Sequence, residues 1–246
     1  MGESISVIIP VYNAANSIVE LYQRLTNSLS QISNNYEIIM IDDNSQDNSC
    51  EKILRLQKQD NRVKFIKLAK NFGQQNALLC GLNYVQGDYV VTIDDDLQHN
   101  PELIPTLYRL ITKGYDVVYS IPESREYSFF RKIGSKLTDF LFSILTSKEA
   151  GIRVSSYRIM SKDLVKKVIK HKESFVYISV IVLQKTKNIA NIYYDYENRK
   201  YGKSNYNFRK LMMLFLKIYL YHGNIFFLKY LRSDKPQYII EKKTGF

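Results

Sequence analysis

The sequence predicts an α/β protein with a mostly parallel β-sheet flanked by helices and a C-terminal amphipathic helical extension. Short runs of β-branched residues alternate with longer helical patterns through the first two-fifths of the chain. Polar, turn-forming residues follow four successive runs. With 246 residues, 45% of them hydrophobic and 24% charged, the chain is long enough to form one large domain with a substantial core.

The individual elements follow from these patterns in chain order. Apolar β-branched runs bounded by turn residues predict strands, and the amphipathic stretches between them predict right-handed crossover helices. The expected strands cover residues 6–11, 38–41, 63–68, 89–93 and 117–120. The expected helices cover residues 17–30, 49–59, 75–84, 102–112 and 129–145.

Charge and cysteine content limit the partners and the compartment. The net charge of +11 suits nucleic acid, an anionic membrane surface or a phosphorylated substrate. Cys50 and Cys80 lack redox or zinc-ligand spacing, and the first residues lack the apolar region of a secretory signal. We therefore expect a cytoplasmic protein that associates with the inner face of the cell membrane.

Three adjacent carboxylates, Asp94, Asp95 and Asp96, follow the strand expected at residues 89–93. Such neighbours repel one another unless a cation lies between them, and carboxylate oxygens favour Mg²⁺ or Mn²⁺ over zinc. Taken alone, the run also fits a solvated acidic turn. As a functional motif, it predicts a site for a divalent cation and a diphosphate.

The ends of the other strands carry polar residues too. In open parallel sheets, ligands bind beyond the carboxyl ends of the strands, so these residues should meet at one edge. The residues after the first three strands are Tyr12-Asn13, Asp42-Asp43-Asn44-Ser45 and Asn71-Phe72-Gly73-Gln74. Each group alone fits a capped turn, whereas four groups at one edge favour a binding site.

In their order along the chain, these motifs resemble those of the family 2 glycosyltransferases with the Rossmann-like GT-A fold. The most similar subgroup contains dolichol-phosphate mannose synthase and bacterial polyprenyl-phosphate glycosyltransferases. Two later segments, GIRVSSYRIMSK from Gly151 and RKYGKSNY from Arg199, also resemble motifs of that subgroup. The resemblance covers about residues 5–210 and implies a nucleotide-binding half at 1–100, an acceptor half at 101–206 and an extension at 207–246.

The resemblance implies which residues bind the donor. The divalent cation, Mg²⁺ or Mn²⁺, would be held by Asp94, Asp96 and Gln98. One aspartate of the second strand would accept hydrogen bonds from the nucleobase, and many relatives carry lysine at the position of Gln74. The full set of implied nucleotide-sugar contacts is Pro10, Tyr12, Asn13, Asp42, Asp43, Asn71, Gly73, Gln74, Asp94 and Asp95.

The reaction implied is substitution, with inversion, at the anomeric carbon of a nucleotide-diphospho-sugar in cell-surface glycan assembly. A polyprenyl phosphate acceptor is already ionised and needs no general base, whereas the alternative acceptor, a sugar hydroxyl of a lipid-linked oligosaccharide, needs one. His99 is expected to be a structural turn histidine, and Arg158 could brace the fold. Besides Asp94 and Asp96, the implied catalytic residues, near the acceptor phosphate, are Arg125, Arg131, Arg199 and Ser204.

The segment 207–232 combines aromatic and leucyl residues with lysine and arginine. Its longest uncharged stretch, at residues 211–216, is far shorter than the roughly 20 residues that span a bilayer. An apolar face at Phe208, Leu211, Met212, Phe215 and Tyr219 suits either the membrane interface or a contact with the core or a second subunit.

A basic chain with 20 tyrosines also fits a nucleic-acid-binding module, whose rings would stack on bases. The clustered aspartates argue against that class, because they would repel a polyanion. A Rossmann-type dehydrogenase is disfavoured because the first strand ends in PVYN and not in a glycine-rich turn. The preferred interpretation is a metal-dependent glycosyltransferase.

Overall fold

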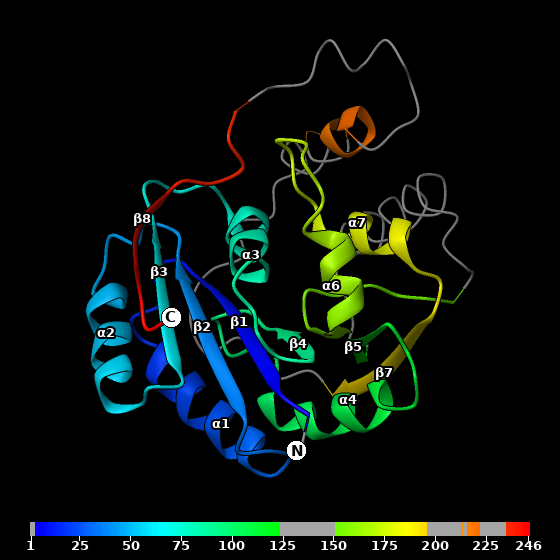
Figure 1. Ribbon diagram of the computed structural model, residues 1–246, viewed down its shortest axis with the longest axis horizontal. Coiled ribbons are helices and arrows are strands. Elements are labelled where there is room, and N and C mark those ends of the chain that lie inside the picture. The colour runs from blue at the N-terminus through cyan, green and yellow to red at the C-terminus, as the bar shows by residue number, and fades with distance from the viewer. Residues whose placement is uncertain (1–2, 124–150, 196–212, 214–215, 222–234) are drawn as a thin grey trace.

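The fold is built on one eight-stranded sheet in the strand order β7-β5-β6-β4-β1-β2-β3-β8 (Figure 1). The computed structural model describes residues 3–123, 151–195, 213, 216–221 and 235–246. The strands are β1 (Ile5–Val11), β2 (Tyr36–Asp42), β3 (Val63–Leu68), β4 (Tyr89–Thr92), β5 (Val117–Glu123), β6 (Arg158–Ser161), β7 (Ile189–Asp195) and β8 (Ile240–Thr244). The helices are α1 (Ile18–Ser30), α2 (Ser49–Gln59), α3 (Gln74–Leu82), the short 3₁₀ turn η1 (Pro101–Leu103), α4 (Ile104–Ile111), α6 (Lys162–Val168) and α7 (Ile178–Lys185).

The sheet is mostly parallel, as the sequence predicted. Strands β1 to β4 run parallel, β6 is antiparallel to both β4 and β5, and β7 is parallel to β5. All five predicted strands are present, as are the four predicted helices that fall within the described residues. The helix expected at 129–145 lies outside them.

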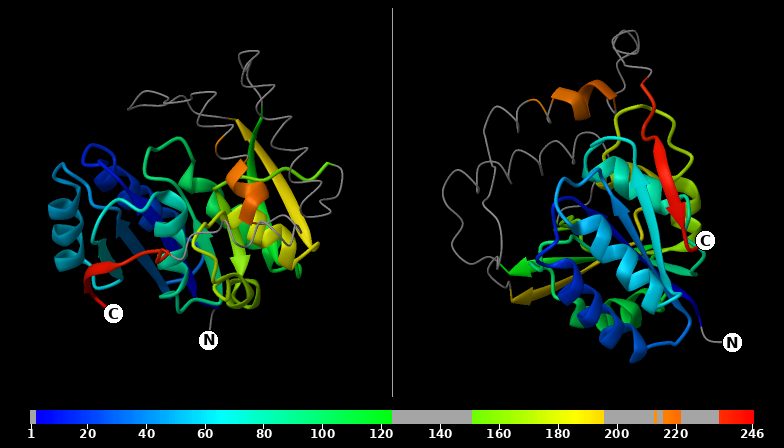
Figure 2. Two further views of the ribbon diagram at one scale, coloured as in Figure 1. Left: turned by 90° about the horizontal axis from the view of Figure 1, so that it is seen from above. Right: turned by 90° about the vertical axis from the view of Figure 1, so that its left-hand side faces the viewer.

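Helices cover both faces of the sheet (Figure 2). Apolar residues of α1, α2 and α4 pack on one face, and those of α3, α6 and α7 pack on the other. Successive residues of β1 and β2 point to opposite faces, so all positions of both strands are buried. This explains why these strands appear in the sequence as continuous apolar runs rather than alternating ones.

The C-terminal strand β8 was not predicted. It lies within residues 207–246, which were expected to form a helical extension, yet β8 pairs antiparallel with β3 and occupies one edge of the sheet. Three of the five residues in its sequence, IEKKT, are exposed. Exposed charged side chains on an edge strand hinder pairing with a strand of another chain. Such a strand lacks the apolar pattern from which strands are predicted.

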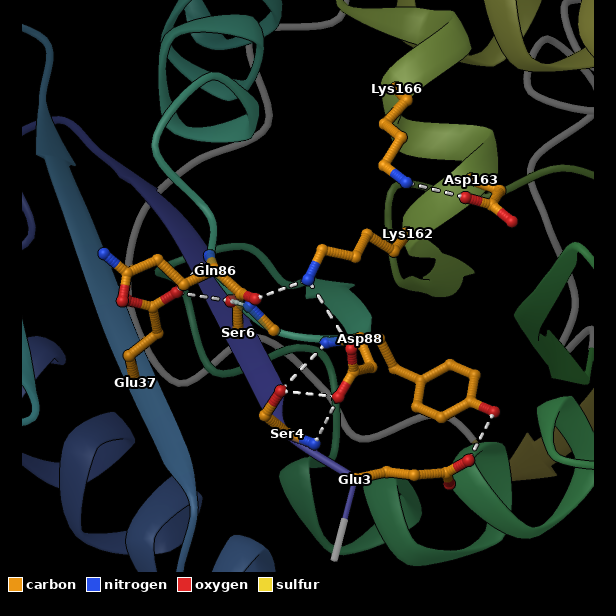
Figure 3. Close-up of polar contacts among 11 residues, drawn as sticks. Glu3, Ser4, Ser6, Glu37, Gln86, Asp88, Lys162, Asp163 and Lys166 are labelled. Atoms are coloured by element: carbon orange, nitrogen blue, oxygen red, sulfur yellow. Dashed lines mark hydrogen bonds and ion pairs between the residues drawn. The ribbon is translucent and has the colours of Figure 1, made fainter. Parts of the chain in front are cut away.

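The amino ends of the central strands are joined by side chains (Figure 3). The hydroxyl of Ser6 on β1 and the backbone N–H of Gln86 both donate to Oε1 of Glu37 on β2, at 2.5 and 2.7 Å. Lys64 of β3 lies 2.9 Å from the other oxygen of Glu37, and both side chains of this ion pair are largely buried. This network fixes the edge of the sheet opposite to the predicted site.

At the carboxyl ends of the first four strands, the chain turns through residues with left-handed backbone conformation. Positive φ angles occur at Asn13 after β1, Asn44 after β2, Gly73 after β3 and Leu97 after β4, at 54°, 61°, 88° and 59°. Asparagine and glycine adopt this conformation at little cost, whereas a leucine is strained by about 1 kcal/mol. These turns bring the polar residues after each strand to one edge of the sheet.

In the C-terminal extension, the structure describes a short helical segment at 216–221. Ile218 is buried there against Val180 and Leu183 of α7, so one face of the segment contacts the core. Leu216 and Tyr219 are exposed, and Tyr219 alone of the predicted apolar face is described. No helix within the described residues is long and apolar enough to cross a membrane.

Candidate active site

A cavity of about 310 Å³ opens at the carboxyl edge of strands β1 to β4. It is bounded by the loops that follow these four strands, as the sequence predicted for a ligand site. Eight of the ten predicted nucleotide-sugar residues line it together, with Asp96 and Val11 as further lining residues. The full lining is Pro10, Val11, Tyr12, Asp43, Asn71, Gly73, Gln74, Asp94, Asp95 and Asp96.

Asp94 is held by hydrogen bonds to both of its oxygens. Nε2 of Gln74 donates to Oδ1 at 2.6 Å, and the hydroxyl of Ser156 donates to Oδ2 at 2.8 Å. Gln74 opens α3, and Ser156 precedes β6, so the carboxylate is fixed from two sides of the cavity. Both donors are neutral, which leaves the negative charge of Asp94 uncompensated.

Asp95 points back toward β1 and accepts a hydrogen bond from the backbone N–H of Tyr12 at 3.0 Å. Burial, together with the charges of the neighbouring Asp94 and Asp96, raises the pKa of this carboxyl from 3.8 to about 7, against the opposing effect of the Tyr12 N–H. Among the described residues, no lysine or arginine forms an ion pair with Asp94 or Asp95. The negative charge gathered here would be stabilised by a cation.

The third aspartate, Asp96, begins the turn that carries the remaining predicted metal ligand. Its Oδ1 accepts the backbone N–H of Gln98 at 3.1 Å, and Leu97 between them is buried with its strained positive φ. Among the described residues, no three His, Cys, Asp or Glu side chains form a complete metal cage. Hard oxygen donors in such a partial set fit Mg²⁺ or Mn²⁺, which commonly take one or two carboxylates together with phosphate oxygens of a substrate.

The two aspartates at the end of β2 have different environments. Asp43 lines the cavity and accepts the backbone N–H groups of Phe72 and Gly73 at 2.7 and 2.8 Å, which ties together the loops after β2 and β3. Asp42 is fully buried outside the lining, and both of its oxygens accept the N–H of Ser45 at 3.3 Å. Burial raises the pKa of both carboxyls. Of the two, only Asp43 faces the cavity.

In the loop after β1, one residue lines the cavity and the next holds neighbouring loops together. Tyr12 lines the cavity with 49% of its surface exposed, so its ring is free to contact a ligand. Asn13 is not in the lining, and its Oδ1 accepts the N–H of Gln46 while its own N–H donates to Ser45. Asn13 therefore links the loops after β1 and β2.

Two residues near the site received no site role in the sequence analysis. Ser156 was missed because it follows from the antiparallel pairing of β6 with β4, and β6 was not predicted. Arg158 is buried on β6, donates to the hydroxyls of Thr92 and Ser179 at 3.3 and 3.1 Å, and lies over the ring of Tyr119. It joins β6 to β4, β5 and α7, which fits a bracing role.

The remaining predicted site residues divide into two groups. Gln98 is half-buried on the turn after the three aspartates, and its backbone N–H bonds to Asp96. The four residues assigned to the acceptor, Arg125, Arg131, Arg199 and Ser204, lie outside the described residues. Most of the residues that were predicted to bind the donor thus lie together around one cavity.

The family described as Glycosyl transferase family 2 matches residues 6–169, more than half of the chain. The protein is therefore a glycosyltransferase and belongs to glycosyl transferase family 2. This membership favours the enzyme interpretation over the nucleic-acid-binding alternative. The match does not extend to the dolichol-phosphate mannose synthase subgroup, which stays a prediction.

Several solved structures share the fold at low sequence identity. Glucosyl-3-phosphoglycerate synthase from Mycobacterium tuberculosis, in complex with Mn²⁺, UDP and glucosyl-3-phosphoglycerate, aligns with a TM-score of 0.64 and 18% identity over 89% of this chain and 78% of that chain. Its complex with Mn²⁺, UDP and phosphoglyceric acid aligns at 0.66 and 17% over 89% and 77%. A structure described as a mycobacterial protein gives 0.66 and 17% over 89% and 73%. These likenesses confirm the GT-A fold.

Proposed function

We propose that this enzyme transfers a sugar from a nucleoside-diphospho-sugar with the help of a divalent cation, Mg²⁺ or Mn²⁺. The observation that carries the proposal is the set of three adjacent carboxylates in the cavity, with Asp94 and Asp95 lacking a lysine or arginine ion-pair partner among the described residues. A cation with a diphosphate would supply the missing positive charge and hold the leaving group. The solved relatives that hold Mn²⁺ and UDP support this choice.

Most lining residues, together with Gln98, have a proposed role in donor binding. Asp96 and Gln98, together with Asp94, would hold the cation, which stabilises the negative charge of the departing nucleoside diphosphate when bound. Asp43 would accept a hydrogen bond from the base, since each of its oxygens retains a second lone pair. The rings of Pro10 and Tyr12 would form one wall, with the loop from Asn71 to Gln74 opposite.

For the acceptor, we propose a polyprenyl phosphate or a related phosphorylated molecule. The net charge of +11 favours an anionic partner, and the phosphoglycerate named in the solved relatives is also anionic. Arg125, Arg131, Arg199 and Ser204 are the proposed contacts with the acceptor phosphate. Because a phosphate oxygen is already ionised, attack with inversion at the anomeric carbon would need no general base.

We also propose a peripheral contact with the inner face of the cell membrane through the C-terminal helical region. Met213, Leu216 and Tyr219 are all exposed, and Leu216 and Tyr219, three residues apart, lie on one side of the helical segment at 216–221. Apolar groups of this kind beside lysines suit the interface of an anionic bilayer. Such a contact would bring the enzyme to a lipid acceptor.

Product mass spectrometry tests the proposed reaction. The purified chain is incubated with UDP-, GDP- and dTDP-sugars, Mg²⁺ and Mn²⁺, and a short polyprenyl phosphate in detergent. We expect a glycosyl phospholipid that disappears with EDTA and with Asp96→Asn, while the variant keeps the wild-type melting temperature. Transfer to a lipid-linked oligosaccharide alone would reassign the acceptor to a sugar hydroxyl, and metal-independent transfer would reject the cation.

A further inference from the structure

His99 lies beside the carboxylate of Asp94 without a hydrogen bond from its inner ring nitrogen. Nδ1 of His99 is buried and has no hydrogen-bond partner, and it lies 3.7 Å from Oδ2 of Asp94. That separation is too long for a hydrogen bond and too short for a water molecule between the two atoms. A buried polar nitrogen without a partner is uncommon and calls for an explanation.

The ring of His99 is held in this orientation by its neighbours. It stacks on the ring of Tyr157, with centroids 5.1 Å apart and an angle of 28° between the planes. Tyr157 is buried, and its hydroxyl donates to the backbone oxygen of Asn100 at 2.8 Å. The side chain of Asn100 accepts the N–H of Glu102 and so fixes the start of η1. The imidazole is therefore directed at Asp94 by a rigid surrounding.

The carboxylate of Asp94 has room for a third donor. Its two oxygens accept one hydrogen bond each, from Gln74 and Ser156, and a carboxylate can accept about four. A neutral imidazole with its proton on Nδ1 would donate to Oδ2 after a movement of less than 1 Å. Because all three donors are neutral, the charge of Asp94 would remain available to a cation.

We propose that His99 is a positioning residue that donates its Nδ1–H to Oδ2 of Asp94 when the cation and nucleotide are bound. The hydrogen bond fixes the orientation of the Asp94 carboxylate, in the way that outer hydrogen-bond partners orient metal-site carboxylates. His99 itself contacts neither the cation nor the sugar. This inference rests on the proposed function, since it assigns His99 to the same donor site.

Three substitutions at His99 separate its possible roles. The side-chain amide of His99→Asn places an N–H near the position of Nδ1, whereas that of His99→Gln reaches the position of Nε2. His99→Phe keeps a ring to stack on Tyr157 but has no donor. His171→Phe is the matched control, since His171 lies outside the cavity lining and its Nε2 bonds to the backbone oxygen of Phe175.

Isothermal titration calorimetry with UDP, GDP and dTDP, in Mn²⁺ and in EDTA, measures the effect without a catalytic assay. In Mn²⁺ we expect His99→Phe and His99→Gln to weaken binding of the preferred nucleotide by about tenfold or more, the range for outer partners of metal ligands. We expect His99→Asn to retain most of the affinity and His171→Phe to equal wild type. In EDTA all variants should bind alike, and thermal melting confirms that each is folded.

Wild-type affinity in His99→Phe would overturn the proposal. So would a His99→Asn variant that is folded yet as weak as His99→Phe, because a donor near the position of Nδ1 would then fail to restore the affinity. If His99→Phe and His99→Gln lost as much nucleotide affinity in EDTA as in Mn²⁺, the proposal would also be overturned, since the effect would be independent of the cation. If wild type binds none of the three nucleotides with Mn²⁺, the proposed function itself fails, and this outcome is distinct from the others.

Discussion

Asp95 is the residue that links the charge of the cavity most directly to the stability of the protein. Its carboxyl has a pKa of about 7 in the folded protein and 3.8 in the unfolded chain. Between these two values, the folded state binds more protons than the unfolded state, so the free energy of unfolding decreases as pH rises from about 4 to 7. Without a cation, Asp95 therefore destabilises the fold at neutral pH.

This decrease in the free energy of unfolding with rising pH leads to a prediction for Asp95→Asn. The amide keeps an oxygen to accept the Tyr12 N–H but carries no charge, so the variant should be more stable than wild type at pH 8 and nearly equal to it at pH 4. The expected gain at pH 8 is of order 1 kcal/mol or more, since each pKa unit corresponds to ~1.4 kcal/mol. Urea unfolding at several pH values measures it. A difference that does not change with pH would contradict the assignment of the raised pKa to Asp95.

Ser156 gives a second prediction at the residue scale. Ser156→Ala removes the hydroxyl that donates to Oδ2 of Asp94, and the loss of one such bond costs ~0.5–1.5 kcal/mol. We expect Mn²⁺-dependent nucleotide affinity to fall by a few-fold, with little change in melting temperature. Ser155→Ala is the control, because the hydroxyl of Ser155 accepts the backbone N–H of Tyr157 at 3.1 Å instead of donating to Asp94. Equal losses for the two serines would argue against a specific role for Ser156.

At the scale of elements, strand β8 completes the sheet by covering the open edge of β3. Thr244 on β8 donates to Oε1 of Gln57 on α2 at 2.8 Å, and Lys67 on β3 forms an ion pair with Glu241 on β8. Gly245 follows with a φ of +87°, and a Cβ placed there would lie 2.4 Å from Nε2 of Gln57 and 3.1 Å from the backbone oxygen of Val63. The end of β8 is thus seated closely against its neighbours.

Gly245→Ala tests this seating, with Gly114→Ala as its control. Both glycines have positive φ, but a Cβ at Gly114 would meet nothing within 4 Å. Gly114→Ala should therefore lower stability only by the backbone strain of ~1 kcal/mol. Gly245→Ala should lower it further, because the backbone oxygen of Val63 cannot move as freely as a side chain. Equal or smaller destabilisation at Gly245, measured by thermal melting, would mean that β8 does not hold this position in solution.

The success of sequence-based prediction also differs between elements. Strands β1, β2 and β4 were predictable because burial on both faces leaves mostly apolar runs, and β3 from the apolar residues between its two lysines. The polar ends of these strands revealed most of the cavity lining. Strands β6, β7 and β8 were not predicted; β6 has only four residues, and β8 exposes its charges. The role of Ser156 depends on β6 beside β4, and the Gln74 contact with Asp94 joins residues 20 positions apart. Such contacts follow from tertiary geometry, which no local pattern encodes.

At the scale of the whole molecule, the exposed apolar residues of the C-terminal region set a testable expectation for membrane contact. Replacing both Met213 and Leu216 with glutamate should reduce binding to anionic vesicles about tenfold or more, since each buried apolar side chain contributes ~1.5–3 kcal/mol. Val19→Glu on α1 is the control, because Val19 is also exposed but lies on a different helix. Vesicle co-sedimentation measures the effect, and nucleotide affinity should be unchanged. Equal vesicle binding by wild type and double variant would assign this face to another contact.

The side-chain network at the amino ends of β1, β2 and β3 has a consequence for protein engineering. Glu37 is bonded to Ser6, Gln86 and Lys64, none of which lines the cavity. Strand register is therefore secured at the edge opposite to the loops that would determine donor choice. Loops from other family members could be grafted after β2 and β3 together, because Asp43 at the end of β2 accepts hydrogen bonds from the loop after β3. The scaffold would then serve as a platform for redesigning donor selectivity.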